Sequence, residues 1–302
     1  MTGETTTTTA AGIAPPGYRL PAATRLGRVV LQVSDLARSL DYYERVLGFR
    51  TLERDTVRAT LGAHDGGDAP PLVELRERRG IAAVPRRGLL GLFHFAVLLP
   101  AREDLGRFLA HLAQLGTQTG MSDHLVSEAI YLTDPDGLGI EVYADRPRSA
   151  WRYEGGQIAM TTIALDARDL LRAGGATPWS GMPAGTTIGH VHLHVGDLER
   201  AEAFYHDALG FDKVVWGYPG ALFLSAGGYH HHLGTNTWAA GAPSASDDDA
   251  RLVEWEIVMP SEGDAAAAAE SLAGAGYAVT PAGAQWLVAD PWGTTVRIRC
   301  AA

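Results

Sequence analysis

Histidines gathered in two short segments are the first sign of chemistry in this chain. The sequence has 302 residues and eleven histidines. Three of them alternate with apolar residues in Gly189-His-Val-His-Leu-His-Val, and three more follow one another directly after Tyr229. A neutral imidazole binds transition metals and, with a pKa near ~6.5, accepts or relays protons at neutral pH. Because a histidine run alone also binds metal adventitiously, the elements that position these residues decide their meaning.

The segments that carry the histidines belong to an internal repeat. Residues 28–49 align without a gap with residues 190–211, and both end in Leu-Gly-Phe. Apolar alternation predicts a strand at the start of each, and an Asp then stands where it would cap a following helix. In the same way residues 92–100 resemble residues 252–260, and Asp-Pro-x-Gly turns come later in both halves. The sequence therefore predicts strand–helix–strands units, repeated along the chain.

Four such units are expected, near residues 27–85, 88–148, 187–245 and 250–302. They divide the chain into a flexible N-terminal arm, an N-terminal half, a crossover linker with one short helix around 165–171, and a C-terminal half. The boundaries are placed at 1–26, 27–148, 149–186 and 187–302.

Composition excludes several classes of partner. The formal net charge of −10 argues against general affinity for nucleic acid or for anionic lipid. The single cysteine, Cys300, excludes an intramolecular disulfide framework and a thiolate zinc cage within the chain. No apolar run approaches the roughly 20 residues that cross a bilayer. We therefore expect a cytoplasmic protein that binds a small molecule, and neither nucleic acid nor a membrane.

The repeated strand–helix–three-strand unit resembles the vicinal oxygen chelate superfamily over nearly the whole chain after residue 26. The segments Gly189-His-Val-His-Leu-His-Val-Gly-Asp-Leu and Gly227-Gly-Tyr-His-His-His-Leu-Gly resemble those of type I extradiol dioxygenases, the catechol 2,3-dioxygenases of the Bacillus-like branch. The resemblance implies an α+β fold of four βαβββ modules that form two cupped mixed sheets, the glyoxalase/bleomycin-resistance/extradiol dioxygenase fold. In this fold, metal ligands come from the first and last strands of each module.

The residues in those ligand positions predict how the modules pair. In chain order the first strands offer Arg28, His94, His190 and Glu254, and the last strands offer Glu74, Glu141, Gly234 and Arg297. Pairing neighbouring modules would put an arginine into both cups. Pairing modules 2 and 3, and modules 1 and 4, places His94, Glu141 and His190 in one cup and leaves ion-pairing residues in the other. The sequence favours this second pairing, within one chain or by a swap between two chains.

Two histidines and one carboxylate form the facial triad of non-haem Fe(II) oxygenases, and Mn(II) accepts the same ligands. The resemblance implies that both atoms of O2 enter a catechol-type aromatic diol, giving a 2-hydroxymuconic semialdehyde-type product. It assigns acid–base chemistry to His231, and hydrogen bonds with the substrate hydroxyls to His124 and Tyr131. Substrate contacts are expected from His192, His230 and Trp238, and Trp179, Trp216 and Phe223 are further candidates for an aromatic wall.

Two other functions on the same fold are weighed. A glyoxalase-like isomerase or epimerase would need a fourth protein ligand, yet Gly234, followed by Thr235, stands in that position. A ligand-binding resistance protein would have no metal triad or an idle one. Both are disfavoured by the triad together with His231 and Tyr131. The sequence leaves open the identity of the catechol or hydroquinone, the choice between Fe(II) and Mn(II), and whether the chain forms a homo-oligomer.

Overall fold

The computed structural model describes residues 12–64 and 70–301. Of the expected N-terminal arm, residues 1–11 lie outside the described part. Residues 12–24 pack along the third module, where Ile13 bridges to Lys213, Leu20 is buried, and Arg19 forms an ion pair with Asp212 at 2.7 Å. The first strand of the fold then begins at Arg25.

Each expected module is one strand, one helix and three strands. The first contains β1 (Arg25–Val33), α1 (Leu36–Tyr42) continued by η1 (Tyr43–Leu47), β2 (Arg50–Arg54), β3 (Arg58–Gly62) and β4 (Val73–Glu77). The second contains β5 (Gly91–Leu98), α2 (Arg102–Leu115), β6 (Gly120–Asp123), β7 (Ser127–Thr133) and β8 (Gly139–Asp145).

The C-terminal half repeats this order. The third module contains β11 (Thr187–His194), α4 (Leu198–Glu202) continued by η3 (Ala203–Ala208), β12 (Asp212–Val215), β13 (Ala221–Ser225) and β14 (Leu233–Asn236). The fourth contains β15 (Arg251–Met259), α5 (Glu262–Gly274), β16 (Val279–Pro281), β17 (Trp286–Ala289) and β18 (Thr295–Cys300). The predicted caps are present, since the side chains of Asp35 and Asp197 each accept a backbone N–H at a helix start.

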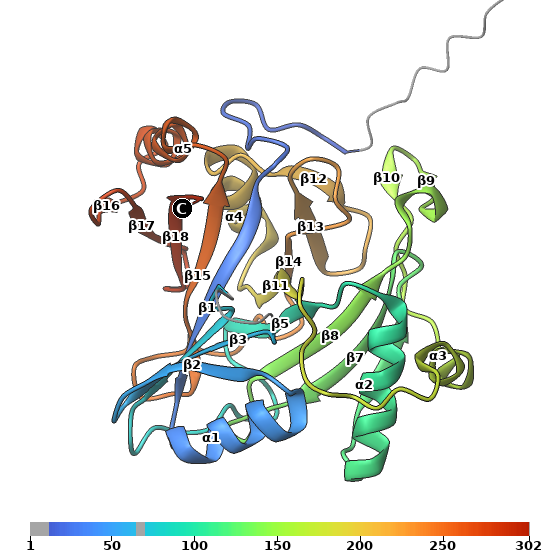
Figure 1. The fold of residues 1–302 in the computed structure, drawn as a ribbon. Coiled ribbons are helices and arrows are strands. Elements are labelled where there is room, and N and C mark those ends of the chain that lie inside the picture. Colours follow the sequence, from blue (N-terminus) through green and yellow to red (C-terminus); the bar gives the residue numbers. More distant parts are fainter. Residues whose placement is uncertain (1–11, 65–69, 302) are drawn as a thin grey trace, which may run out of the picture.

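The modules pair as the ligand positions predict. One eight-stranded sheet has the order β16-β17-β18-β15-β1-β4-β3-β2 and joins modules 4 and 1. The other has the order β12-β13-β14-β11-β5-β8-β7-β6 and joins modules 3 and 2. In Figure 1 the blue and orange-red strands form the first sheet, and the teal, green and yellow-brown strands form the second. The predicted fold, including the pairing of modules 2 with 3 and 1 with 4, is confirmed, and the structure makes this pairing within one chain.

The crossover between the halves contains η2 (Arg148–Ala150), β9 (Tyr153–Glu154), β10 (Gln157–Ile158) and α3 (Ala167–Gly174), which is the short helix expected there. α3 packs against α2, where Gly106 and Gly174 approach so closely that a Cβ on Gly106 would lie 2.6 Å from the Gly174 nitrogen. Within the described residues, no helix combines the length and the apolar character that crossing a membrane requires.

Along each central strand, alternate side chains point into the hydrophobic core on one face of the sheet and into the cup, its concave face, on the other. Val191, Leu193 and Val195 are fully buried in the hydrophobic core, beneath the helices. The intervening histidines must therefore face the opposite side of the sheet, because successive strand side chains point in opposite directions. This arrangement keeps the apolar face for stability and leaves the concave face for chemistry.

The cup of modules 1 and 4 is filled by ion pairs. Arg297 makes two hydrogen bonds with Glu254, at 2.6 and 2.7 Å, and Arg28 contacts Glu74 at 2.6 Å. Glu256 extends the second pair to a further arginine, since it lies 3.1 Å from Arg28 and 2.9 Å from Arg299. The carboxylates of this cup are thus neutralised by arginines.

Candidate metal centre and active-site cavity

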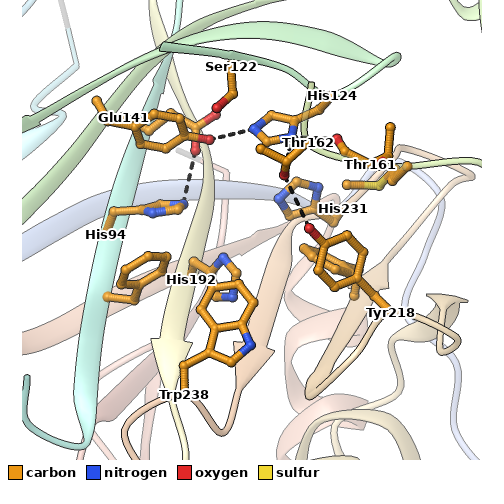
Figure 2. Close-up of a pocket in the computed structure, with 14 residues that line it drawn as sticks. His94, Ser122, His124, Glu141, Thr161, Thr162, His192, Tyr218, His231 and Trp238 are labelled. Carbon is orange, nitrogen blue, oxygen red and sulfur yellow. Dashed lines mark hydrogen bonds and ion pairs between the residues drawn. The ribbon is translucent and has the colours of Figure 1, made fainter. Parts of the chain in front are cut away.

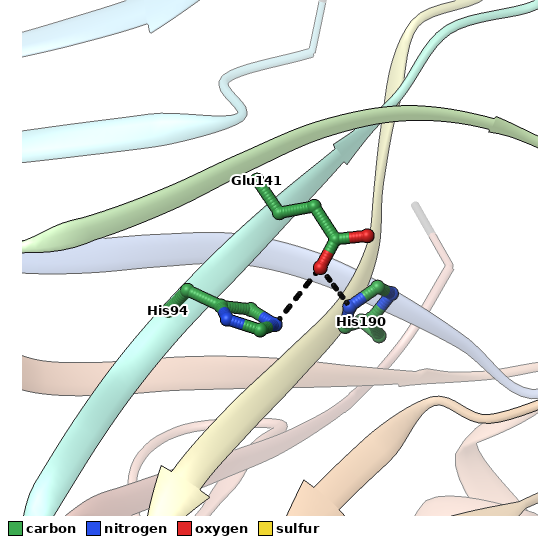
Figure 3. Close-up of side chains that lie close together, drawn as sticks. All are labelled: His94, Glu141 and His190. Carbon is green, nitrogen blue, oxygen red and sulfur yellow. Dashed lines mark hydrogen bonds and ion pairs between the residues drawn. The ribbon is translucent and has the colours of Figure 1, made fainter. Parts of the chain in front are cut away.

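His94, Glu141 and His190 meet in the cup of modules 2 and 3. The Nε2 atoms of His94 and His190 lie 3.0 and 3.2 Å from the same oxygen, Oε2 of Glu141. Figure 3 shows the three side chains converging from β5, β8 and β11. All three residues are buried, and one ligand atom of each lies within 4.8 Å of the other two.

Strand register explains why these residues meet. In the sheet, Glu141 on β8 lies beside Ala96 on β5, and Ala96 lies beside His190 on β11. The small side chain of Ala96 leaves the space in which the longer side chains on either side approach each other. His94, two residues before Ala96 and on the same face, closes the group. Module 2 therefore contributes two of the three residues, from β5 and β8, and module 3 contributes one, from β11.

Burial keeps the imidazoles ready to bind a cation. Desolvation lowers the pKa of His190 to about 4, against the opposing influence of the Glu141 carboxylate. Burial likewise lowers the pKa of His192 and of His231 well below the usual histidine value. Neutral imidazole is the form that donates a lone pair to a metal, so protonation does not compete with binding near neutral pH.

Two further observations indicate that the three side chains could hold a metal ion: a buried nitrogen without a hydrogen-bond partner, and the spacing of the ligand atoms. Nε2 of His94 is buried and has no hydrogen-bond partner of acceptable geometry among the described residues, although it points at Glu141. Ligand atoms about 2.1 Å from an ion, at right angles to each other, lie about 3 Å apart. The spacings of 3.0 and 3.2 Å match that separation.

The fourth ligand position is occupied by a neighbouring ring. Gly234 on β14 lies beside His192 on β11, and a Cβ at Gly234 would lie 2.9 Å from the His192 ring. The ring of His192 therefore takes the volume that a fourth ligand side chain would need. The adjacent Thr235 is fully buried, and its hydroxyl donates to the carbonyl of Leu222 at 3.3 Å. Three protein ligands leave other positions open to small molecules.

A cavity of about 230 Å³ opens beside the triad. Figure 2 shows Glu141, Ser122 and His124 at one end of it, and Trp238 with the adjacent His192 at the other. Its wall consists of His94, Glu141, His192, His231, His124, Tyr131, Phe93, Phe223, Trp238, Tyr218, Met160, Ser122, Thr161 and Thr162. Aromatic and apolar side chains therefore enclose most of the space, as in sites for small planar molecules.

His124 and Tyr131 form a hydrogen-bonded pair in this wall. Nδ1 of His124 lies 2.8 Å from the carbonyl oxygen of Thr161, and Nε2 lies 2.6 Å from the Tyr131 hydroxyl. Because a carbonyl only accepts, Nδ1 carries the proton, and in the neutral ring Nε2 accepts from Tyr131. The crossover linker thus sets the orientation of His124.

The remaining predicted residues fall in different places. His231, His192 and Trp238 line the cavity, and Phe223 does as well. His230 is fully buried and does not line it, since it contacts Asp145 and His231 instead. Trp179 lies outside the cavity and packs against Phe108 at a ring distance of 5.1 Å. Trp216 also lies outside the wall and is 37% exposed.

Sequence reasoning missed the contribution of the linker. Met160, Thr161 and Thr162 line the cavity, and the Thr162 hydroxyl lies 3.1 Å from that of Tyr218. Nothing in a Met-Thr-Thr tripeptide signals a site, because its position depends on how the crossover returns over the cup. Asp145 was also missed, although strand alternation places it on the same face as Glu141 and would have revealed it.

The fold and the centre together define a class of protein: two βαβββ modules per cup, with two histidines and a glutamate that could hold a metal ion and an aromatic cavity beside them. Residues 25–142 and 187–298 match the model of the Glyoxalase/Bleomycin resistance protein/Dioxygenase superfamily. The chain belongs to this superfamily.

Individual relatives agree with that assignment. The catechol-2,3-dioxygenase of Bacillus subtilis (strain 168) is 44% identical over 272 residues, which cover 89% of this chain and 94% of the relative. Among solved structures, a Bacillus subtilis protein assigned provisionally to the dioxygenases aligns over 94% of this chain and 86% of its own, with 15% identity and a TM-score of 0.64. Glyoxalase I from Zea mays aligns over 92% of both chains, with 19% identity and a TM-score of 0.54. These two structures show the shared fold alone, and the resemblance inferred from the sequence is confirmed.

Proposed function

We propose that the protein is an extradiol ring-cleaving dioxygenase that inserts both atoms of O2 into a catechol-type diol. The observation that carries the proposal is a triad of His94, Glu141 and His190 whose fourth position is filled by the ring of His192. A three-ligand centre leaves room for a chelating diol and for dioxygen, whereas a glyoxalase-type isomerase would use a fourth protein ligand. The 44% identical catechol-2,3-dioxygenase supports the same reaction.

The metal proposed is Fe(II), with Mn(II) as the alternative, held by His94, Glu141 and His190. When bound, such an ion supplies the site at which the diol and dioxygen come together and the electron transfer between them. The protein supplies geometry, because the three ligands project from neighbouring strands of one rigid sheet. It also supplies a wall that keeps bulk water from the reacting molecules.

Three side chains are assigned to proton and hydrogen-bond chemistry. A catechol must lose protons to chelate a cation, and His231 offers a neutral imidazole at the edge of the cavity. Burial first, and then the Glu141 carboxylate, raise the pKa of Tyr131 well above its usual value, so this hydroxyl stays a donor. Tyr131 and His124 are therefore suited to hold a substrate oxygen, and His231 to accept or return a proton.

The cavity also indicates the kind of catechol. Its described wall contains neither lysine nor arginine, while Phe93, Phe223 and Trp238 supply ring surfaces. A substrate carboxylate would be desolvated there without a counter-charge, which is unfavourable. We therefore propose an uncharged catechol as substrate, with a carboxylated catechol reacting more slowly.

The test is oxygen uptake by protein loaded anaerobically with Fe(II) or with Mn(II), with absorbance followed for a yellow ring-opened product. Catechol and 3,4-dihydroxybenzoate are compared as substrates. Glu141→Ala and His190→Ala should lose bound metal and activity together, while His111→Ala, a histidine on α2 outside the cavity, should retain both. A wild-type protein that binds one metal but consumes no O2 with any catechol or hydroquinone would instead support the isomerase function.

A further inference from the structure

We propose that Asp145 and His230 form a buried pair that positions His231 and determines which of its two ring nitrogens carries the proton. This inference rests on the proposed function, because it concerns the histidine that exchanges protons with the substrate. Asp145 and His230 contribute no ligand atom to the triad and do not line the cavity, although the His230 ring lies edge-on to that of His190 at 6.2 Å between centres, so both are positioning residues.

The contacts run without a break from Asp145, at the C-terminal end of β8, to the cavity. Nε2 of His230 lies 2.8 Å from Oδ1 of Asp145, and Nδ1 of His230 lies 2.7 Å from Nδ1 of His231. The Tyr229 hydroxyl donates to the same Asp145 oxygen at 3.2 Å. His230 is fully buried, whereas the Asp145 side chain is 28% exposed. The carboxylate therefore has access to solvent, and the imidazole behind it does not.

The chemistry of the donors and acceptors settles where the protons lie. An ionised carboxylate only accepts, so Nε2 of His230 must carry a hydrogen. A neutral imidazole carries one N–H, so Nδ1 of His230 is an acceptor, and the hydrogen between the two rings belongs to Nδ1 of His231. This leaves Nε2 of His231 as a free lone pair on a ring that lines the cavity.

The pair also fixes where the His231 ring stands relative to the triad. The ring centre of His231 lies 4.1 Å from that of His190 and 5.0 Å from that of Phe223 in the cavity wall. A ring held by His230 on one side and packed between these two rings has one orientation, which places its Nε2 edge toward the cavity.

The position of Asp145 on β8 links the pair to the triad. Glu141 and Asp145 lie four residues apart on one strand and so face the same side of the sheet. The strand that supplies a metal ligand therefore also fixes the distance between that ligand and the histidine that serves the substrate.

The experiment compares Asp145→Asn and Asp145→Ala with Asp212→Asn, a carboxylate paired with Arg19 outside the cavity. With catechol as substrate, we expect kcat of both Asp145 variants to fall roughly 10- to 100-fold, as for loss of oriented acid–base chemistry. KM and bound metal should stay near wild type, and Asp145→Glu should recover most of the lost kcat. Asp212→Asn should match wild type throughout.

A second measurement does not depend on turnover. In full-length protein with ¹⁵N-labelled histidines and Zn²⁺ as a diamagnetic probe, two-bond ¹H–¹⁵N spectra should show His231 protonated at Nδ1, and this form should be lost in Asp145→Ala. An unchanged tautomer with unchanged kcat would overturn the proposal, as would loss of bound metal, which would make the carboxylate structural. If the wild type consumes no O2, the proposed function fails, while the spectra still decide the role of the pair. Should Asp145→Ala not fold, Asp145→Leu carries the same comparison, because leucine has a similar size and also removes the accepting oxygens.

Discussion

Tyr131 illustrates how single residues acquire a defined role from their neighbours. Its hydroxyl donates to Nε2 of His124, whose other nitrogen is held by the backbone of Thr161. With its pKa raised by burial and by Glu141, Tyr131 does not become a phenolate near neutral pH. The hydroxyl has a single hydrogen, so on substrate binding it can turn from Nε2 of His124 to a substrate oxygen, at a point fixed by β7 on one side and the crossover linker on the other.

Replacing Tyr131 by Phe should lower kcat for catechol roughly 10- to 100-fold, because a hydrogen bond that strengthens as charge develops is removed. Bound metal should not change, since no ligand is touched. Oxygen-uptake kinetics on metal-matched samples provide the measurement. Tyr277→Phe, which also deletes a tyrosine hydroxyl but lies outside the cavity, partly buried against the hydrophobic core, is the control. Equal kcat in both variants would remove Tyr131 from the reaction.

Several residues of the candidate site could be identified from the single sequence, and others could not. His94, Glu141 and His190 could be found because strand alternation and the internal repeat fix which residues occupy equivalent cup-facing positions. The linker residues 160–162 and Asn236, which donates to His192 Nε2 at 2.9 Å, could not be found that way. Their roles depend on loop paths and side-chain rotamers, which no periodicity encodes.

Among the elements, two equivalent turns tie together modules that belong to different cups. In the β7–β8 turn, Asp134 Oδ1 accepts the backbone N–H of Asp136 and of Leu138, both at 2.9 Å, and the Tyr43 hydroxyl of the first module lies 3.4 Å from Oδ2. In the β17–β18 turn, Asp290 is bonded in the same way and accepts from Tyr205 of the third module at 2.7 Å. The duplication thus preserved a contact between modules as well as the modules themselves.

Asp134→Asn should change how stability depends on pH. Burial raises the pKa of Asp134 to about 7, against the opposing backbone hydrogen bonds. Between its unfolded and folded pKa values the native state holds this proton more tightly, so the free energy of unfolding of the wild type falls as pH rises through that window. Asparagine keeps the accepting oxygen and does not titrate.

Relative to the variant, the wild type should therefore lose about 2–3 kcal/mol of unfolding free energy between pH 5 and pH 8. Urea unfolding of both proteins at the two pH values measures this difference, and other titrating groups cancel in the comparison. If the unfolding free energies of the two proteins differ by the same amount at pH 5 and at pH 8, Asp134 has the same pKa in the folded protein as in the unfolded chain.

The order of elements was predictable because each module has strong local signals: an apolar alternating strand, an aspartate cap and an Asp-Pro-x-Gly turn. Sheet order is a longer-range property, and for it the ligand positions were informative. An arginine in a metal cup is electrostatically unfavourable, so the distribution of charges identified which modules pair. The continuation of α1 and α4 into wider π-type turns at Tyr43 and Ala203 had no such signal.

At the scale of the whole molecule, a duplicated fold has kept chemistry in one cup and replaced it by ion pairs in the other. The two cups have equivalent strands, yet Glu254 and Glu74 are neutralised by Arg297 and Arg28. The histidine-lined cup takes His94 and Glu141 from the N-terminal half and His190 from the C-terminal half. A metal bound there therefore joins two halves of the chain that are separated by the crossover linker.

Metal binding should accordingly stabilise the entire chain, with one ion per chain. At a free metal concentration 100-fold above Kd, the free energy of unfolding should rise by about 2.7 kcal/mol, because an ion that binds only the folded state shifts the equilibrium by mass action. Elemental analysis and urea unfolding with and without a chelator measure both quantities. His190→Ala should abolish the stabilisation, and Arg297→Glu should leave the stoichiometry at one, since the remaining ion pairs of that cup provide no imidazole ligand. Two ions per wild-type chain would mean that the arginine-filled cup also binds metal. Arginines in a cup would then not prevent metal binding, which is the assumption from which the module pairing was inferred.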